Sequence, residues 1–370
     1  MRALVAASAV VALAACGQPS SKPVPKAEGP IGTLSGTLYV TKGPNGETAT
    51  PAAQLALTDA ELAKVKAGKH KVAFLWHTSS PDQESVTAGA KSVFDSLGIE
   101  VVGTASADFD PAKQASQVQT MLARKPDIML AVPVDPAASA AAFRPAVQRG
   151  VKLVVSSVVP KGYVHGKDYV GLVNGDLAEM GKRAAEMLGK SMGGKGKVGL
   201  IYYDANFFAT NARDLAFRSW MQKLYPDIQL VQQGMADPAK GQEAAAALLA
   251  RYPDIGGFYV PWAAPPAQGV VAALRSSGKK HVKVVTFDLD PAVALDMVHG
   301  DYIIGEVVNP PFVLGETMAK LAVWSLVKDT SPDFVVTPPA TVSKDNLAEV
   351  WKQSTGQEPP AAVAKELAAK

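Results

Sequence analysis

The sequence predicts an α/β protein built from two doubly wound parallel sheets. From Lys71 onward, short apolar runs alternate strictly with amphipathic segments of more than ten residues. Such alternation is typical of parallel sheets that carry helices on both faces. The rhythm breaks near residues 171–174 and then restarts, which indicates two α/β domains. A chain of 370 residues is long enough to give each domain its own core.

The N-terminal residues have the features of an export signal. Arg2 is followed by an apolar stretch of about a dozen residues, which is too short to span a bilayer. The stretch ends in the sequence LAAC, which resembles the lipobox of bacterial lipoproteins, and Cys16 is the only cysteine in the chain. The resemblance implies that Cys16 is acylated and anchors the protein to a membrane. The alternative is an ordinary secretory signal with an incidental cysteine.

Residues 17–69 are expected to form a tether and a small N-terminal extension. Residues 17–30 are rich in Pro, Ser and Gly, which favours a flexible linker. The turn residues of 42–47 indicate a small hairpin. Residues 57–68 indicate a short capped helix that ends at a glycine.

The alternating elements of both domains follow from hydrophobic periodicity and from turn or cap residues. In the first domain, strands are expected at residues 71–76, 99–104, 127–133 and 152–157, and helices at 82–98, 110–124 and 136–150. After a strand at 168–174, strands are expected at 197–203, 228–234, 257–262, 283–288 and 302–308, and helices at 176–190, 210–225, 238–252, 267–278 and 291–300. Ligands of such sheets bind beyond the carboxyl ends of the strands, so polar residues at those ends are the candidates for a binding site.

The composition and the motifs argue against several functional classes. The net charge is only +3, and no basic helix carries interleaved aromatic residues, which argues against nucleic-acid binding. The chain has no G-x-S-x-G elbow, no Walker loop and no G-x-G-x-x-G after a strand, so an enzyme is not expected. His77 has no second His or Cys at metal-ligand spacing, and neither a metal nor a cofactor is expected.

Five segments of the chain stand in an order that is typical of one family. They are residues 110–138, 175–188, 210–220, 284–302 and 307–323. Together they resemble type I periplasmic solute-binding proteins of the ribose- and galactose-binding kind, over about residues 70–350. The resemblance implies two lobes joined by three hinge crossovers, near residues 171–174, 308–310 and 335–338. It also implies a ligand between the lobes that hinge closure buries.

The resemblance divides the chain into five parts. Residues 1–16 are the signal peptide, 17–69 the tether and extension, 70–172 with 310–336 the N-terminal lobe, 173–309 with 337–355 the C-terminal lobe, and 356–370 a tail.

Three residues match ligand-binding positions of the family. Arg213 matches an arginine whose guanidinium donates to hydroxyls or a carboxylate, and its alternative role is a solvated helix charge. Asp288 matches a carboxylate that accepts from sugar hydroxyls. A helix cap or a loop salt bridge is the alternative for Asp288, but Asp290 directly precedes Pro291 and is the better N-cap candidate. Asn309 stands where the family commonly places a ligand-binding amide.

The sequence also departs from the sugar-binding members of this family. Residues 80–83 read SPDQ where relatives often carry two aromatic residues, and residues 156–159 read SSVV where many have an Asp-Arg pair. Trp262 replaces an Asn that relatives carry at the end of a strand. The further candidates for ligand contact are therefore Trp76, His77, Gln83, Phe207 and Trp262. Aromatic faces stack on sugars or planar ligands, and core packing is their alternative role.

These observations predict a binding protein rather than an enzyme. The expected function is that of a lipid-anchored, extracytoplasmic solute-binding protein, periplasmic or on the cell surface. It would deliver a sugar or polyol-like ligand to the permease subunits of an ABC importer, as a monomer that touches the membrane only through its anchor. The alternative keeps the fold but binds a planar or anionic ligand, such as a nucleoside, an autoinducer-like furanose or a quinone cofactor, or serves as a chemosensory receptor.

Overall fold

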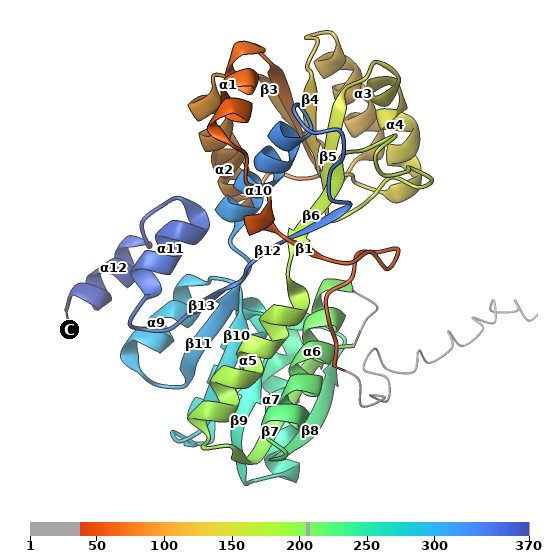
Figure 1. Ribbon diagram of the computed structural model, residues 1–370. Coiled ribbons are helices and arrows are strands. Elements are labelled where there is room, and N and C mark those ends of the chain that lie inside the picture. Colours follow the sequence, from red (N-terminus) through yellow and green to blue (C-terminus); the bar gives the residue numbers. More distant parts are fainter. Residues whose placement is uncertain (1–37, 205–207, 370) are drawn as a thin grey trace, which may run out of the picture.

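The computed structural model describes residues 38–204 and 208–369, and they form two α/β lobes that lie one above the other (Figure 1). Cys16 and Phe207 lie outside the described residues. Each lobe is a parallel or mostly parallel sheet with helices on both faces. The predicted fold class is therefore confirmed.

The first lobe, at the top of Figure 1, contains a seven-stranded sheet. All of its paired strands run parallel. Across the sheet the strands are β1 (Thr50–Pro51), β12 (Phe334–Thr337), β6 (Gly171–Gly175), β5 (Lys152–Ser156), β4 (Ile128–Ala131), β2 (Lys71–Trp76) and β3 (Glu100–Ser106). The helices of this lobe are α1 (Asp59–Ala67), α2 (Pro81–Leu97), α3 (Pro111–Leu122), α4 (Pro136–Gln148) and α10 (Pro311–Trp324).

Side chains of β2 alternate between the two faces of this sheet. Val72, Phe74 and Trp76 pack into the core beneath α2 and α10. Ala73 and Leu75 pack into the core beneath α3 and α4. This period of two is the ordinary geometry of a strand, and both of its faces are apolar because helices cover both sides of the sheet.

The second lobe contains a six-stranded sheet that is parallel except at one edge. Its strands are β13 (Ala340–Val342), β11 (Ile303–Val308), β10 (Lys283–Phe287), β9 (Ile255–Tyr259), β7 (Lys195–Tyr203) and β8 (Asp227–Met235), with β13 antiparallel to β11. The main helices are α5 (Leu177–Ser191), α6 (Phe208–Leu224), α7 (Gly241–Arg251), α8 (Gln268–Ser276) and α9 (Pro291–His299). Two separate apolar cores, one on each face, hold this lobe together.

The chain passes between the lobes three times. The passages connect β6 to α5, β11 to α10, and β12 to β13. Because β6 stays in the first sheet through Gly175, the first passage falls at Asp176, slightly later than expected. The C-terminal residues add α11 (Leu347–Thr355) and α12 (Ala361–Ala368), and α12 packs against α9 of the second lobe.

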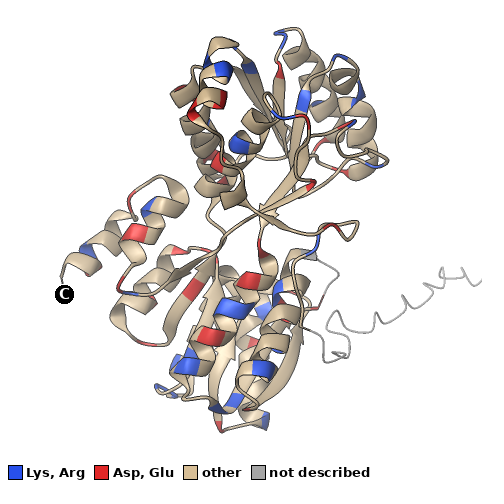
Figure 2. Cartoon of the chain, in the orientation of Figure 1, with Lys and Arg blue, Asp and Glu red and all other residues tan. Residues whose placement is uncertain are grey.

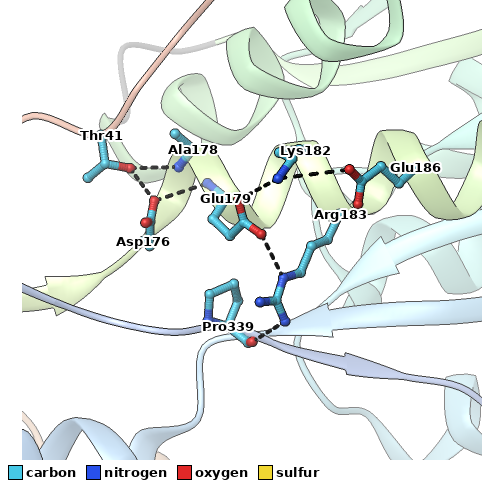
Figure 3. Close-up of polar contacts among 8 residues, drawn as sticks. All are labelled: Thr41, Asp176, Ala178, Glu179, Lys182, Arg183, Glu186 and Pro339. Atoms are coloured by element: carbon cyan, nitrogen blue, oxygen red, sulfur yellow. Dashed lines mark hydrogen bonds and ion pairs between the residues drawn. The ribbon is translucent and has the colours of Figure 1, made fainter. Parts of the chain in front are cut away.

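The N-terminal extension runs along the hinge and touches both lobes. In the second lobe, the Tyr39 N–H donates to the Ser219 hydroxyl. Figure 3 shows that the Thr41 hydroxyl donates to the Asp176 carboxylate and accepts from the Ala178 N–H at 2.9 Å. Thr41 and Asp176 thus satisfy two N–H groups at the start of α5, which the helix itself cannot pair.

The extension then joins the first lobe. β1 adds a short parallel strand to the edge of the sheet at β12. Leu55 and Val65 fill the core beneath α2, and Glu61 of α1 pairs with Lys328. The extension therefore belongs to the folded body of the protein and covers a sheet edge that is otherwise open to pairing.

Charged side chains are spread over both lobes with the two signs intermixed (Figure 2). Within the part of the chain that the structure describes, no helix combines the length and the apolar character needed to cross a membrane.

Candidate functional site

A cleft of about 330 Å³ lies between the two lobes, where the carboxyl ends of the strands face each other. This volume is at the lower end of the range for small-molecule sites. The first lobe contributes His77, Thr78, Ser80, Asp82, Gln83, Val86, Val132, Ser156 and Ser157. Helix α10 of the same lobe adds Pro311, Leu314 and Met318. The remaining walls are Asp288, Leu289, Val308, Asn309, Ser354 and Thr355.

The start of α2 forms the first-lobe wall. Ser80 caps the helix by accepting from the Gln83 N–H at 3.2 Å, and Pro81 occupies the first helical position. Because the helix begins at this cap, Asp82 and Gln83 lie in the first turn of α2 and line the cleft. Gln83 is only 7% exposed, and its side-chain nitrogen has no hydrogen-bond partner among the described residues.

Asp288 forms the opposite wall, at the end of β10. Its backbone adopts a φ of +66°, an uncommon conformation for a residue other than glycine, and its side chain is 54% exposed. Asp290 caps α9 by accepting from the N–H groups of Ala292 and Val293 at 2.9 and 3.0 Å. The expected division of roles is thus observed: Asp290 starts the helix, and Asp288 faces the cleft.

The charge of Asp288 acts on Asp82 across the cleft. Reduced solvation and, to a smaller extent, the negative charge of Asp288 raise the pKa of Asp82. No lysine or arginine is found among the described residues that line the cleft. The site is therefore an acceptor-rich environment, suited to hydroxyl or other donor groups and unfavourable to anions.

Arg213 lies behind Asp288 rather than in the cleft wall. One guanidinium nitrogen is 3.5 Å from the Asp288 carboxylate, and the other donates to the Pro261 carbonyl at 3.0 Å. The guanidinium also lies 4.6 Å from the centre of the Phe287 ring. Arg213 is 7% exposed, so in this arrangement it positions the Asp288 carboxylate rather than lining the cleft.

Asn309 and His77 both line the cleft. The Asn309 side-chain oxygen accepts from the Thr337 hydroxyl at 2.9 Å, which ties two of the lobe passages together. Burial lowers the pKa of His77, which favours its neutral ring. That ring meets Phe109 edge-on at 5.0 Å, and its Nδ1 has no partner in the described structure.

Two aromatic candidates lie away from the cleft wall. Trp76 is 2% exposed, stacks on Phe74 and donates to the Thr87 hydroxyl at 2.9 Å. The expectation that it contacts ligand is therefore corrected: the strand period places it on the core face. Trp262 is half-buried against the second-lobe core and meets Tyr203 edge-on at 5.4 Å.

Sequence reasoning missed several polar residues of the cleft. Ser157 has a φ of +66°, and its N–H donates to the Asn174 side chain at 2.7 Å. Its position directly after β5 is the signal that marks it as a candidate. Ser354 and Thr355 come from α11, for which the sequence carries no binding motif. Asp135 and Asp176 are helix caps.

The site suits reversible binding. Within residues 38–204 and 208–369, no group of three His, Cys, Asp or Glu side chains is arranged to hold a metal ion. The cleft offers acceptors on both lobes and three passages about which the lobes can hinge, which is the arrangement needed to bury a ligand on closure.

Comparison with known proteins agrees with this architecture. The profile of a family described as periplasmic binding protein domain matches residues 72–328. The chain is 28% identical over 214 residues to the ribose import binding protein of Salmonella typhimurium, covering 58% of this chain and 70% of that protein. The ribose import binding protein of Escherichia coli matches equally well, at 28% over 214 residues.

Solved structures show the same fold. An arabinose-binding protein from Geobacillus stearothermophilus superimposes with a TM-score of 0.66 at 20% identity, over 75% of this chain and 98% of that chain. A solute-binding protein from Agrobacterium vitis, solved with bound α-D-tagatopyranose, gives 0.59 at 22% identity, over 81% and 99%. The family match covers well over half of the residues. Because members of this family bind solutes, the match confirms the prediction of a binding protein rather than an enzyme. The chain belongs to the periplasmic binding protein domain family.

Proposed function

We propose that this protein is an extracytoplasmic solute-binding protein that holds a sugar or polyol between its lobes and delivers it to an ABC importer. The observation that supports this best is the pair of facing carboxylates, Asp82 and Asp288, in a cleft whose described lining has no lysine or arginine. A polyol has many hydroxyl groups that donate to carboxylates while its carbon face tolerates apolar walls. The relatives named above are ribose import binding proteins, and the neighbours are an arabinose-binding protein and a solute-binding protein solved with α-D-tagatopyranose.

Closure of the lobes is the event that a transporter would read. Asp82 is carried by the first lobe and Asp288 by the second, so a ligand that bonds to both favours the closed arrangement. Arg213 would hold the Asp288 carboxylate in place during this step. In the alternative role of chemosensory receptor, the same closure would be read by a different partner.

The planar or anionic ligand is less well supported. An anion would meet two carboxylates and no cationic side chain in the described cleft lining. Trp76, one of the aromatic faces expected to stack on such a ligand, is part of the core.

Binding is tested with the chain that begins at Gly17. A thermal-shift panel of D-ribose, D-arabinose, D-allose, D-tagatose, myo-inositol, nucleosides and aromatic acids should give a shift for one or more of the sugars or polyols. Calorimetry with the best compound should show about ten- to hundredfold weaker binding for Asp288→Asn, because a hydrogen bond to a charged group is lost. Asp290→Asn is the matched control, since asparagine also caps helices and affinity should persist. A shift for nucleosides or aromatic acids alone would overturn the sugar proposal.

We further propose that the protein is anchored through Cys16 and acts as a monomer. A fatty-acid label should enter the full-length protein and should not enter Cys16→Ser. Labelling of that variant would refute the anchor, and a concentration-independent monomer mass from light scattering would support the second point.

A further inference from the structure

Besides the His77 ring, two side chains in the cleft wall carry buried polar atoms without a hydrogen-bond partner among the described residues. Ser354 is 0% exposed and its hydroxyl is unpaired. The side-chain nitrogen of Gln83, which is 7% exposed, is also unpaired. A buried polar group without a partner destabilises the fold, whereas an alanine or methionine of similar shape would not. Their presence in one cleft therefore points to a partner that arrives with the ligand.

Ser354 reaches the cleft because α11 lies across both lobes. Leu347 and Trp351 of α11 pack into the second-lobe core, while the helix also contacts α2 and α10 of the first lobe. Figure 1 shows α11 at the level where the two lobes meet. At the end of the helix, Gly356 has a φ of +74° and lies close to the Phe312 ring, so the last turn is held against the first lobe.

The last turn of α11 thus contributes a third wall to the cleft. The Thr355 hydroxyl already donates to the Trp351 carbonyl at 2.8 Å, so only the Ser354 hydroxyl remains unpaired there. The surrounding wall is apolar and includes Leu314 and Met318. An amide N–H of Gln83 needs an acceptor, and a serine hydroxyl can donate or accept. A hydroxyl group satisfies both needs at once.

We propose that Ser354 and Gln83 form an accessory subsite that binds one hydroxyl of the ligand, separate from the hydroxyls held by Asp82 and Asp288. This inference rests on the proposed sugar or polyol ligand and extends its site to the C-terminal helix. The subsite makes Ser354 a residue that determines specificity. A polyol with a hydroxyl group at the subsite should bind more tightly than one with hydrogen or a methyl group there, because the deoxy compound leaves both side chains unpaired.

The test uses Ser354→Ala and Gln83→Met in the chain that begins at Gly17. With the tightest-binding compound among D-ribose, D-arabinose, D-allose, D-tagatose and myo-inositol, each variant should lose about threefold to tenfold in affinity, the equivalent of one neutral hydrogen bond. Because both side chains would bond to the same hydroxyl, the double variant should lose less than the product of the two single losses. The melting temperature of each ligand-free variant should equal or exceed that of the parent chain.

The control is Ser325→Ala, at the end of α10, whose hydroxyl donates to the Ala322 carbonyl at 2.7 Å. It should leave affinity unchanged. Unchanged affinity in Ser354→Ala, or a lowered melting temperature of its ligand-free form, would overturn the subsite while leaving the sugar proposal intact. If none of the five compounds binds the parent chain, the sugar proposal fails and the subsite fails with it.

Discussion

Glu306 is a fully buried acidic group of the second lobe, and it makes the stability of the protein depend on pH. It lies in β11, opposite Thr286 and Val342 of the neighbouring strands, and is 0% exposed. Neither carboxyl oxygen has a hydrogen-bond partner among the described residues. Burial and, secondarily, the charges of Asp288 and Asp290 raise the pKa of Glu306 well above its ordinary value.

The sign of the effect follows from proton linkage. In the unfolded chain the glutamate loses its proton near pH 4.3, while in the folded protein it keeps the proton to a much higher pH. Over that interval the folded state binds more protons, so stability falls as pH rises, by up to about 1.4 kcal/mol per pH unit.

Replacing Glu306 with glutamine removes this titration and keeps the side-chain shape. The free energy of unfolding of Glu306→Gln, from urea titrations between pH 5 and 7.5, should exceed that of the parent chain by an amount that grows with pH. Glu243→Gln, at a side chain that is 72% exposed, is the control and should show no such growth. Parallel curves for Glu306→Gln and the parent chain would refute the reasoning, because they would mean that Glu306 titrates normally in the folded state.

Two further predictions concern the hinge and the packing of the first lobe. Thr41→Ala should lower the free energy of unfolding by about 1 kcal/mol, because it removes part of the cap of α5. Thr41→Ser keeps the hydroxyl and should retain the stability of the parent chain. Equal losses for the two variants in urea titrations would contradict the capping role. Gly89→Ala should lower the free energy of unfolding by about 2 kcal/mol or more, although alanine favours helices. The reason is that the added carbon would lie 1.9 Å from the Phe312 carbonyl oxygen. A higher melting temperature of this variant would contradict the prediction and show that α2 and α10 can move apart.

Local sequence signals were sufficient for most of the fold. Asp135 and Asp290 stand directly before a proline at the end of an apolar run, and both cap the helices expected there. Asp288 was predictable because the carboxyl end of a parallel strand faces the cleft. The two-residue strand β1 was not predictable, since its pairing with β12 connects residues far apart in the sequence and leaves no periodic pattern.

The details of the site depend on contacts that one sequence does not carry. Trp76 follows an apolar run and precedes a polar loop, and only the register of β2 decides that its ring enters the core. Arg213 was expected in the cleft, yet its guanidinium supports Asp288 from behind because Pro261, which follows β9, and Phe287 at the end of β10 provide its partners. Ser354 reaches the cleft only through the placement of α11 against both lobes.

The central claim is that a ligand binds between the lobes and closes them. A chain that begins at Gly17 has no cysteine, so Ala137→Cys at the start of α4 and Gln242→Cys at the start of α7 can carry one spin label on each lobe. Both helices follow strands whose carboxyl ends face the cleft. With a saturating concentration of the sugar that gives the largest thermal shift, the distance distribution between the labels should move to shorter values. A distribution that stays unchanged while the sugar raises the melting temperature would contradict binding with closure in this cleft.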